Sequence, residues 1–201
     1  MNNVEVIVKL RNETGAGVMD CRKAWERGEQ NFEKALRILS ESVMVKAAKQ
    51  ADRQAAEGVI EMYSHGTGRI GVMVEINTET EFASRSETFR RFAHEIALQI
   101  TSTSPLYTRD EDIPAEVIDR LAEDAAAKAS AEGKPEKIIP VITNGVVEKY
   151  RNTHVLLRQP YIRDESITVR DLLNRTISQI RENIIIRRFE RWAITPEADS
   201  E

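Results

Sequence analysis

Acidic side chains gather near the end of one predicted strand, and they are the first candidates for chemistry in this chain of 201 residues. The three carboxylates belong to Glu75, Glu79 and Glu81. Two carboxylates whose environments separate their pKa values can act as general acid and general base. Acidic groups near strand ends are, however, usually hydrated. A solvated loop therefore explains this cluster better than an enzymatic carboxylate pair.

The other residue types that carry chemistry lack the spacing that their chemistry needs. His65, His94 and His154 are far apart, and none has a histidine four residues away or a cysteine nearby, so metal-ligand spacing is absent. The sequence contains neither a glycine-rich phosphate loop nor the Gly-x-Ser-x-Gly turn that exposes a nucleophilic serine. We therefore expect no catalytic residue, no bound metal and no cofactor.

Composition narrows the classes of partner. The chain has 29 Lys and Arg against 33 Asp and Glu, a net charge of −4, so it lacks the basic surface that binding to a nucleic-acid backbone requires. No stretch approaches the roughly 20 apolar residues of a membrane span. A single cysteine, Cys21, cannot form an internal disulfide, which fits a reducing compartment. We expect a soluble cytoplasmic protein that contacts neither nucleic acid directly nor a membrane.

The first forty residues have helical spacing in three short segments, which Gly15-Ala16-Gly17 and Gly28 separate. Asn31 is placed to cap the third helix. So short a bundle buries only a small core and commonly serves as a docking module. We predict a three-helix, ubiquitin-associated-like bundle over residues 1–41. A helical linker should follow over residues 42–57, where Ala and Lys are frequent and Gly and Pro are absent.

From Gly58 onward the apolar residues alternate, which indicates a β-hairpin with one buried face. Apolar residues from Phe89 to Ile100 then recur at helical spacing, so a long helix should pack on the hairpin. Ser84 and Glu87 have the spacing of a capping box at the start of this helix. Pro105 is expected to end it.

The rest of the chain continues the mixture of helix and extended segments. The expected elements are a helix from about residue 114 to 131, a helical pattern over 135–151, extended chain at 155–157, a helix over 169–180 and a strand over 183–192. Pro140 should kink the second of these helices or delay its start. We expect the final strand to return to the hairpin, with Ile184, Ile186 and Arg188 on one face. The sequence therefore predicts an α+β core domain over residues 58–201, with helices packed on a three-stranded antiparallel sheet.

The polar segment from Asn77 to Ala83 contains one large aromatic side chain, Phe82. A phenylalanine in such a turn either packs back on its own helix or is presented to a pocket of a partner. Residue statistics alone favour the first alternative.

Several segments resemble, in the same order along the chain, the motifs of the elongation factor Ts family. Residues 10–24, L-R-N-E-T-G-A-G-V-M-D-C-R-K-A, are similar to the family's L-R-x-x-T-G-A-G-M-M-D-C-K-K-A. The other matches are residues 46–49 (K-A-A-K), 74–83 (V-E-I-N-T-E-T-E-F-A), 159–164 (Q-P-Y-I-R-D) and 182–189 (E-N-I-I-I-R-R-F). The likeness extends over nearly the whole chain and resembles the family's short forms, which have a single core unit.

The resemblance implies a translation elongation factor that exchanges guanine nucleotide on the GTPase elongation factor Tu. Such a protein is not itself an enzyme: it binds the GTPase with GDP, displaces Mg²⁺ and promotes GDP release so that GTP can bind. The family's Mg²⁺-displacing turn corresponds here to Thr80, Glu81, Phe82 and Ala83, so the resemblance implies, against the residue statistics, that Phe82 is presented to a pocket of the partner. Its contact with the GTP-binding domain corresponds to Val18, Met19 and Arg22.

Four positions depart from the family pattern. Glu81 stands where the family has Asp, and the added methylene could displace the carboxylate by about 1 Å. Ala83 replaces Val and Thr78 replaces Cys. Arg181 occupies a glycine position, where the glycine could serve a positive φ.

Two further expectations concern association. The family's short forms imply a homodimer that pairs through sheet edges, because the unpaired edges of an open three-stranded sheet invite association. An alternative function is an adaptor that has lost exchange activity. In that alternative, the ubiquitin-associated-like bundle would bind helices or nascent chains through the loop at Gly15-Ala16-Gly17 and through Met19.

Overall fold

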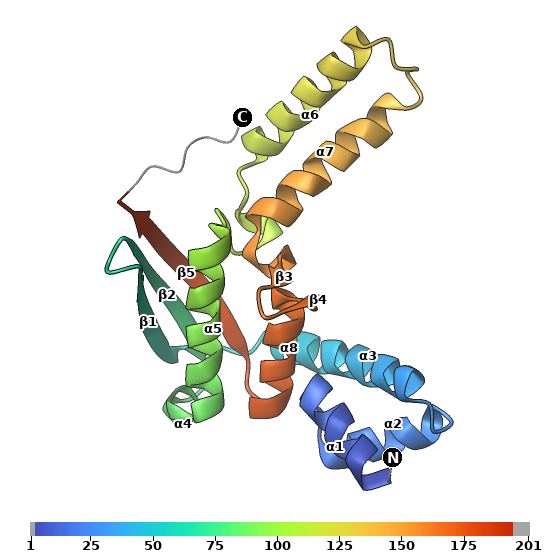
Figure 1. The fold of residues 1–201 in the computed structure, drawn as a ribbon, viewed down its shortest axis with the longest axis vertical. Helices are drawn as coiled ribbons and strands as arrows, with labels where there is room; N and C mark the ends of the chain where they lie inside the picture. The colour runs from blue at the N-terminus through green and yellow to red at the C-terminus, as the bar shows by residue number, and fades with distance from the viewer. Residues whose placement is uncertain (1–2, 195–201) are drawn as a thin grey trace. The chain divides into compact units, whose positions relative to one another are not determined.

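The structure, a computed structural model, describes residues 3–194 (Figure 1). These residues form two compact units: one comprises the described residues up to Leu98 together with those from Arg170 onward, and the other is Gln99–Val169. The predicted α+β class is confirmed, because helices and an antiparallel sheet occur in the same chain. Within residues 3–194, no helix is both long and apolar enough to cross a membrane.

Three helices form the N-terminal bundle, as predicted: α1 (Asn3–Thr14), α2 (Val18–Arg27) and α3 (Phe32–Gln50). Asn31 caps α3 as predicted, since its side-chain oxygen accepts a hydrogen bond of 3.0 Å from the amide of Lys34. Small and medium apolar side chains fill the space between the helices. The buried residues of this core are Val6, Leu10, Ala16, Cys21, Ala24, Ala35, Leu39 and Val43.

Helix α3 continues beyond the boundary expected between bundle and linker. It is a single helix of 19 residues that ends at Gln50, and its later turns bury Val43 and Ala47. No glycine or proline interrupts this segment, so nothing in the backbone stops the helix at residue 41. Residues 42–50 of the predicted linker therefore extend α3. The prediction of a helix up to residue 57 was wrong, because residues 51–56 are not helical and β1 begins at Glu57.

The predicted three-stranded sheet is confirmed: β1 (Glu57–His65), β2 (Ile70–Thr78) and β5 (Ile184–Ala193) pair antiparallel in the order β1-β2-β5. Figure 1 shows helix α5 (Glu87–Thr103) lying along this sheet. Alternate residues of β2 are buried on the inner face, and the apolar stripe of α5 is buried as predicted. The buried side chains are Val72, Val74, Ile76, Phe89, Phe92 and Ile96.

A β-bulge in β5 changes which residues share a face. Ile76 pairs with Ile186 and Glu75 pairs with Arg188, so Arg187 is an extra residue. Arg188 therefore lies on the outer face, where its Nε donates to Glu75 at 2.8 Å. The prediction that Arg188 shares a face with Ile186 was wrong, because one inserted residue reverses the alternation that follows it.

The start of α5 also differs from the prediction. A short helix, α4 (Glu81–Arg85), precedes it, and the Ser84 hydroxyl donates within α4 to the carbonyl of Glu81 at 2.8 Å. The residue that caps α5 is Ser86, whose oxygen accepts from the amide of Phe89 at 3.3 Å. The capping box expected from Ser84 and Glu87 is therefore wrong.

The second unit is dominated by a helical hairpin of α6 (Ala115–Ala131) and α7 (Ile139–His154), and it also contains 3-10 turns at Asp110–Asp112 and Leu156–Arg158. Pro140 lies in the first turn of α7, so the predicted late start is confirmed. Strands β3 (Pro160–Tyr161) and β4 (Asp164–Thr168) pair within this unit. Helix α8 (Val169–Ile180) follows along the chain as predicted and, from Arg170 onward, belongs to the first unit.

The expected extended segment at residues 155–157 is largely wrong. Val155 makes only an isolated bridge with Tyr107, and the chain then turns into the 3-10 helix. Val155, Leu156 and Leu157 are all buried. Their apolar run therefore reflects burial on every side of the turn, which a sequence pattern cannot distinguish from a buried strand.

Candidate functional site

The four residues of the predicted exchange turn lie where β2 passes into α4. Thr80 is the N-cap of α4, since its hydroxyl oxygen accepts a hydrogen bond of 3.2 Å from the amide of Ala83. Glu81 and Phe82 occupy the first turn of the helix, and Ala83 is buried. The structure thus brings all four residues together in one capped helical turn.

Phe82 points away from the protein. Its side chain is 87% exposed, while Ala83 beside it is 3% exposed. The short helix therefore anchors itself through Ala83 and Ser84 and leaves the aromatic ring in solvent. This exposure excludes the alternative in which Phe82 packs back on its own helix.

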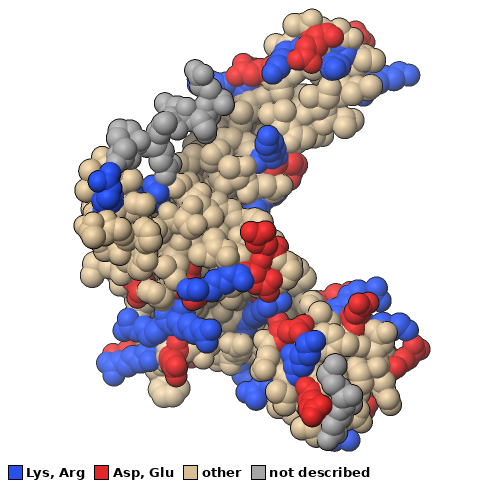
Figure 2. Space-filling model, viewed as in Figure 1, with Lys and Arg blue, Asp and Glu red and all other residues tan. Residues whose placement is uncertain are grey.

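Glu81 forms an ion pair with Arg85 one helical turn later, and both side chains are mostly exposed. Exposed pairs at this spacing stabilise a helix by only about 0.2–0.5 kcal/mol, so the carboxylate can exchange this partner for another at little cost. Arg90 and Arg91 at the start of α5 are exposed as well. Figure 2 shows basic side chains gathered over α4 and the start of α5.

A carboxylate from a distant part of the sequence supports this turn. One oxygen of Glu182 accepts from the Thr80 hydroxyl at 2.7 Å. Its other oxygen accepts from the Thr80 amide at 3.0 Å and from the Thr78 hydroxyl at 3.1 Å. Glu182 was part of a recognised motif, but its spacing in the sequence gave no sign of this contact.

The neighbouring residue, Asn183, is buried and connects the same region to the end of the bundle. Its amide donates to Glu79 at 2.6 Å, and its side-chain nitrogen donates to the carbonyls of Ala51 and Arg53 at 3.1 and 2.8 Å. Arg53 also pairs with Glu79 at 3.4 Å. Residues 182 and 183 therefore contact both the turn and the segment that follows α3.

The second predicted set of site residues lies on α2. Val18 and Met19 are 52% and 61% exposed, and Arg22 is exposed with its Nε 3.3 Å from Glu26. In the same helix Cys21 is fully buried, and burial together with the charge of Asp20 raises the pKa of its thiol. The helix thus sorts its residues into a core face and a solvent-facing group.

The loop that precedes α2 packs against α8, so part of its surface is covered. Gly15 has φ +70°, and a Cβ at this position would lie 2.7 Å from the carbonyl oxygen of Arg175 and 2.9 Å from a side-chain carbon of Gln179. Only glycine fits so close to α8 in this backbone conformation. The surface that the adaptor alternative requires is therefore partly occupied within the chain.

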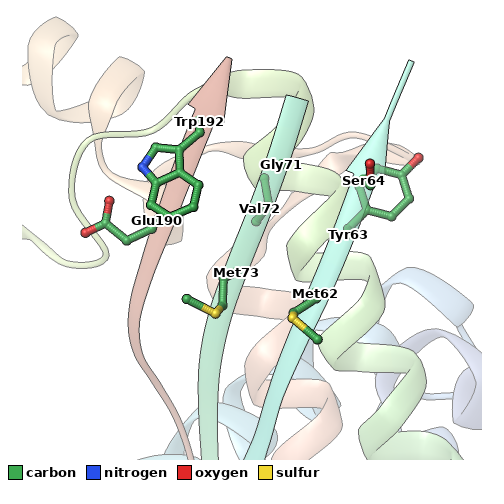
Figure 3. Close-up of a pocket in the computed structure, with 8 residues that line it drawn as sticks. All are labelled: Met62, Tyr63, Ser64, Gly71, Val72, Met73, Glu190 and Trp192. Atoms are coloured by element: carbon green, nitrogen blue, oxygen red, sulfur yellow. The ribbon is translucent and has the colours of Figure 1, made fainter. Parts of the chain in front are cut away.

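The outer face of the three-stranded sheet exposes an apolar surface. Ile60, Met62, Met73 and Trp192 are between 42% and 74% exposed. Figure 3 shows a groove there, in which Met62, Met73 and Trp192 come from three neighbouring strands. Contiguous apolar surface of this kind is typical of interaction sites.

The carboxylates of Glu75, Glu79 and Glu81 each contact different groups. Glu75 contacts Arg188, Glu79 contacts Asn183 and Arg53, and Glu81 contacts Arg85. Each carboxylate therefore has its own partner. Among residues 3–194, no three His, Cys, Asp or Glu side chains are placed to hold a metal ion.

Comparison with known proteins gives one consistent family. Residues 9–176 match the family model described as Elongation factor TS. Proteins named Elongation factor Ts are similar over nearly their whole length. The protein from Acetivibrio thermocellus is 47% identical over 192 residues, 96% of this chain and 89% of the relative. The protein from Carboxydothermus hydrogenoformans is 46% identical over 190 residues, which are 94% of this chain and 88% of the relative. The protein from Coprothermobacter proteolyticus is 43% identical over 192 residues, which are 96% of this chain and 98% of the relative.

Proposed function

The chain belongs to the elongation factor Ts family, and we propose that the Thr80–Ala83 turn and the exposed face of α2 are the two surfaces through which it acts. As a member of this family it is a translation elongation factor that promotes guanine nucleotide exchange on elongation factor Tu. In our proposal it binds the GTPase in its GDP form, displaces Mg²⁺ and promotes GDP release so that GTP can bind.

The exposure of Phe82 is the observation that carries this proposal. A phenylalanine ring left 87% exposed loses the favourable transfer out of water that burial would give. Burial of the ring in a pocket of the GTPase would contribute roughly 1.5–3 kcal/mol to the complex. Because α4 is capped and anchored through Ala83, the ring is already presented, and little conformational entropy is lost when it docks.

The turn would act by competing with the contacts that hold GDP. Backbone amides of a phosphate loop and Mg²⁺ bind the phosphates of such a nucleotide together. Phe82 would enter next to the Mg²⁺ site, and Glu81 would bring a carboxylate there after leaving Arg85. Binding is reciprocal: a factor that weakens nucleotide binding is itself weakened by nucleotide, so incoming GTP releases it.

The bundle would supply the second contact. Val18, Met19 and Arg22 offer two apolar side chains and one guanidinium from the same helix, a combination suited to gripping the GTP-binding domain. We assign this three-helix unit to the ubiquitin-associated-like type. In this proposal the chain carries out no covalent chemistry, and it works in the cytoplasm without direct contact to nucleic acid or to a membrane.

A homodimer is part of the proposal. Strands β1 and β5 form the edges of the three-stranded sheet in the described part of the chain, and the outer face between them is apolar at Ile60, Met62, Met73 and Trp192. A second copy related by a two-fold axis would bring the same apolar patch and the same sheet edges against this face, and so would cover both. Light scattering should give the mass of a dimer. Trp192→Ser should shift the mass towards one chain and Met44→Ser, an exposed change on α3, should not; a monomeric wild-type protein contradicts this part.

The decisive experiment measures release of a fluorescent GDP analogue from elongation factor Tu. The wild-type chain should accelerate release, and Phe82→Ala should reduce the acceleration about tenfold or more because the buried ring is lost. Val141→Ala, which truncates an exposed side chain on α7, serves as the control and should leave the rate unchanged. Release that is unaltered by the wild-type chain would overturn the proposal.

A further inference from the structure

We propose that Glu182 is a positioning residue for exchange, which holds the Thr80–Ala83 turn in the conformation that presents Phe82. This inference rests on the proposed function of that turn. Glu182 lies between α8 and β5, and Ile184 beyond it pairs with Thr78 at the end of β2. The sheet register therefore places the carboxylate next to the turn, although 102 residues separate Glu182 from Thr80.

The hydrogen bonds form a chain from Glu182 to the helix that carries the ring. The Thr80 hydroxyl donates its only proton to Glu182 at 2.7 Å. A lone pair of the same oxygen is thereby directed to the Ala83 amide, which donates at 3.2 Å. The carboxylate thus fixes the rotamer of the cap, and the cap fixes the first turn of α4.

The carboxylate also holds the backbone that enters this turn. Its second oxygen accepts from the Thr80 amide at 3.0 Å and from the fully buried Thr78 hydroxyl at 3.1 Å. Three donors on one carboxylate restrict the turn much more than the capping bond alone. Hydrogen bonds to a charged acceptor contribute more than those between neutral groups, so this brace resists rearrangement.

Asn183 extends the brace to the bundle. Its side chain donates to the carbonyls of Ala51 and Arg53, directly after α3, and its backbone amide donates to Glu79. The consecutive residues Glu182 and Asn183 therefore bind the turn and the segment that follows α3, respectively. Loss of the Glu182 carboxylate should free the turn while the contacts of Asn183 remain.

Positioning can be separated from a purely structural role by measuring GDP release over a range of factor concentrations. Glu182→Ala should lower the maximal release rate about tenfold or more, because a displacement of about 1 Å in the side chains of the turn can slow a geometry-dependent step up to about 100-fold. The concentration for half-maximal rate should rise by a smaller factor than the maximal rate falls, since the ring and α2 remain available for binding although the freed turn must be ordered when it docks. Glu165→Gln, an exposed change on β4, is the matched control.

Glu182→Gln keeps the shape of the side chain and one acceptor oxygen, while its NH₂ group replaces the other oxygen and cannot accept a hydrogen bond. It should therefore lower the maximal rate less than Glu182→Ala. This variant decides the question if Glu182→Ala fails to fold. Hydrogen exchange of the Ala83 amide should become faster in both variants and stay unchanged in Glu165→Gln.

The outcomes are distinct. A wild-type maximal rate in Glu182→Ala, or a loss explained entirely by weaker binding, overturns the positioning role alone. A wild-type chain that does not accelerate GDP release overturns the proposed function, and this inference with it.

Discussion

Gly15 of the bundle lies against the backbone of Arg175 in α8, so close that a Cβ on the glycine would be 2.7 Å from the Arg175 carbonyl oxygen. The backbone of Gly15 is also in the left-handed region, with φ +70°. Two independent constraints, conformation and space, therefore require glycine at this position.

Gly15→Ala should destabilise the protein by about 1–3 kcal/mol, because the left-handed conformation is strained for alanine and the loop must move away from α8. Chemical denaturation measures this change. Gly145→Ala is the informative control: Gly145 lies inside α7 with open space around it, so alanine there should stabilise by about 0.5–1 kcal/mol. Equal effects of the two substitutions would contradict the close packing at Gly15.

Arg181 has φ 65°, which bears out the expectation that the glycine at this family position serves a positive φ. Arg181→Gly should raise the free energy of unfolding by up to about 1 kcal/mol, because the strain of a side chain in this conformation is removed. The denaturation midpoint reports the change. Arg120→Gly in the middle of α6 should lower stability by about 1 kcal/mol, and a loss of stability in Arg181→Gly would contradict the prediction.

Glu81→Asp should increase the maximal rate of GDP release. The shorter side chain matches the family residue and retracts the carboxylate by about 1 Å, a displacement that can change a geometry-dependent rate up to about 100-fold. Glu81→Gln should lower the rate, since the charge is lost. Neither change should alter stability by more than about 0.5 kcal/mol, because the pair with Arg85 is exposed. A slower Glu81→Asp variant would show that the longer acid is matched to its own partner.

Burial lowers the pKa of His154 at the end of α7 below its usual value. The unfolded chain therefore takes up the proton first as pH falls, and stability should decrease from neutral pH down through the lowered pKa of the folded state. His154→Phe keeps a ring next to Tyr150, 4.4 Å away between centroids, and should remove this part of the pH dependence. Urea denaturation at several pH values between about 7 and 5 compares the two proteins. Parallel pH profiles would refute the prediction.

Features of the fold that depend on local periodicity were predictable from the sequence. The apolar stripe from Phe89 to Ile100, the hairpin after Gly58 and the late start of α7 at Pro140 each follow from spacing or from one residue's backbone chemistry. The family motif also placed the Thr80–Ala83 turn directly after a strand, as the structure has it, whereas its role in exchange stays a prediction. The exposure of Phe82 followed only from the resemblance, because residue statistics for a phenylalanine in a polar turn favour packing on its own helix.

Features that depend on distant contacts were not predictable. Glu182 and its partner Thr78 are 104 residues apart, and only the pairing of β2 with β5 brings them together. The sequence does not mark the bulge at Arg187, because nothing in the residue pattern shows where the alternation of inner and outer residues changes. The cap of α5 was misplaced by two residues, because Ser84 and Ser86 both precede a helix-favouring run and only the fold decides between them.

The continuous helix α3 has a consequence for how the two contact surfaces work together. A flexible tether between the bundle and the turn would also make the second contact intramolecular, but its many conformations would lower the effective concentration of that contact. In the proposed complex, α3 is part of the bundle core and Asn183 holds the chain just after its end, so fewer conformations separate the two contacts and the effective concentration of the second contact is higher. The same linkage would make dissociation concerted. When nucleotide displaces the turn, the bundle binds the GTPase through one contact only, and its apparent affinity falls.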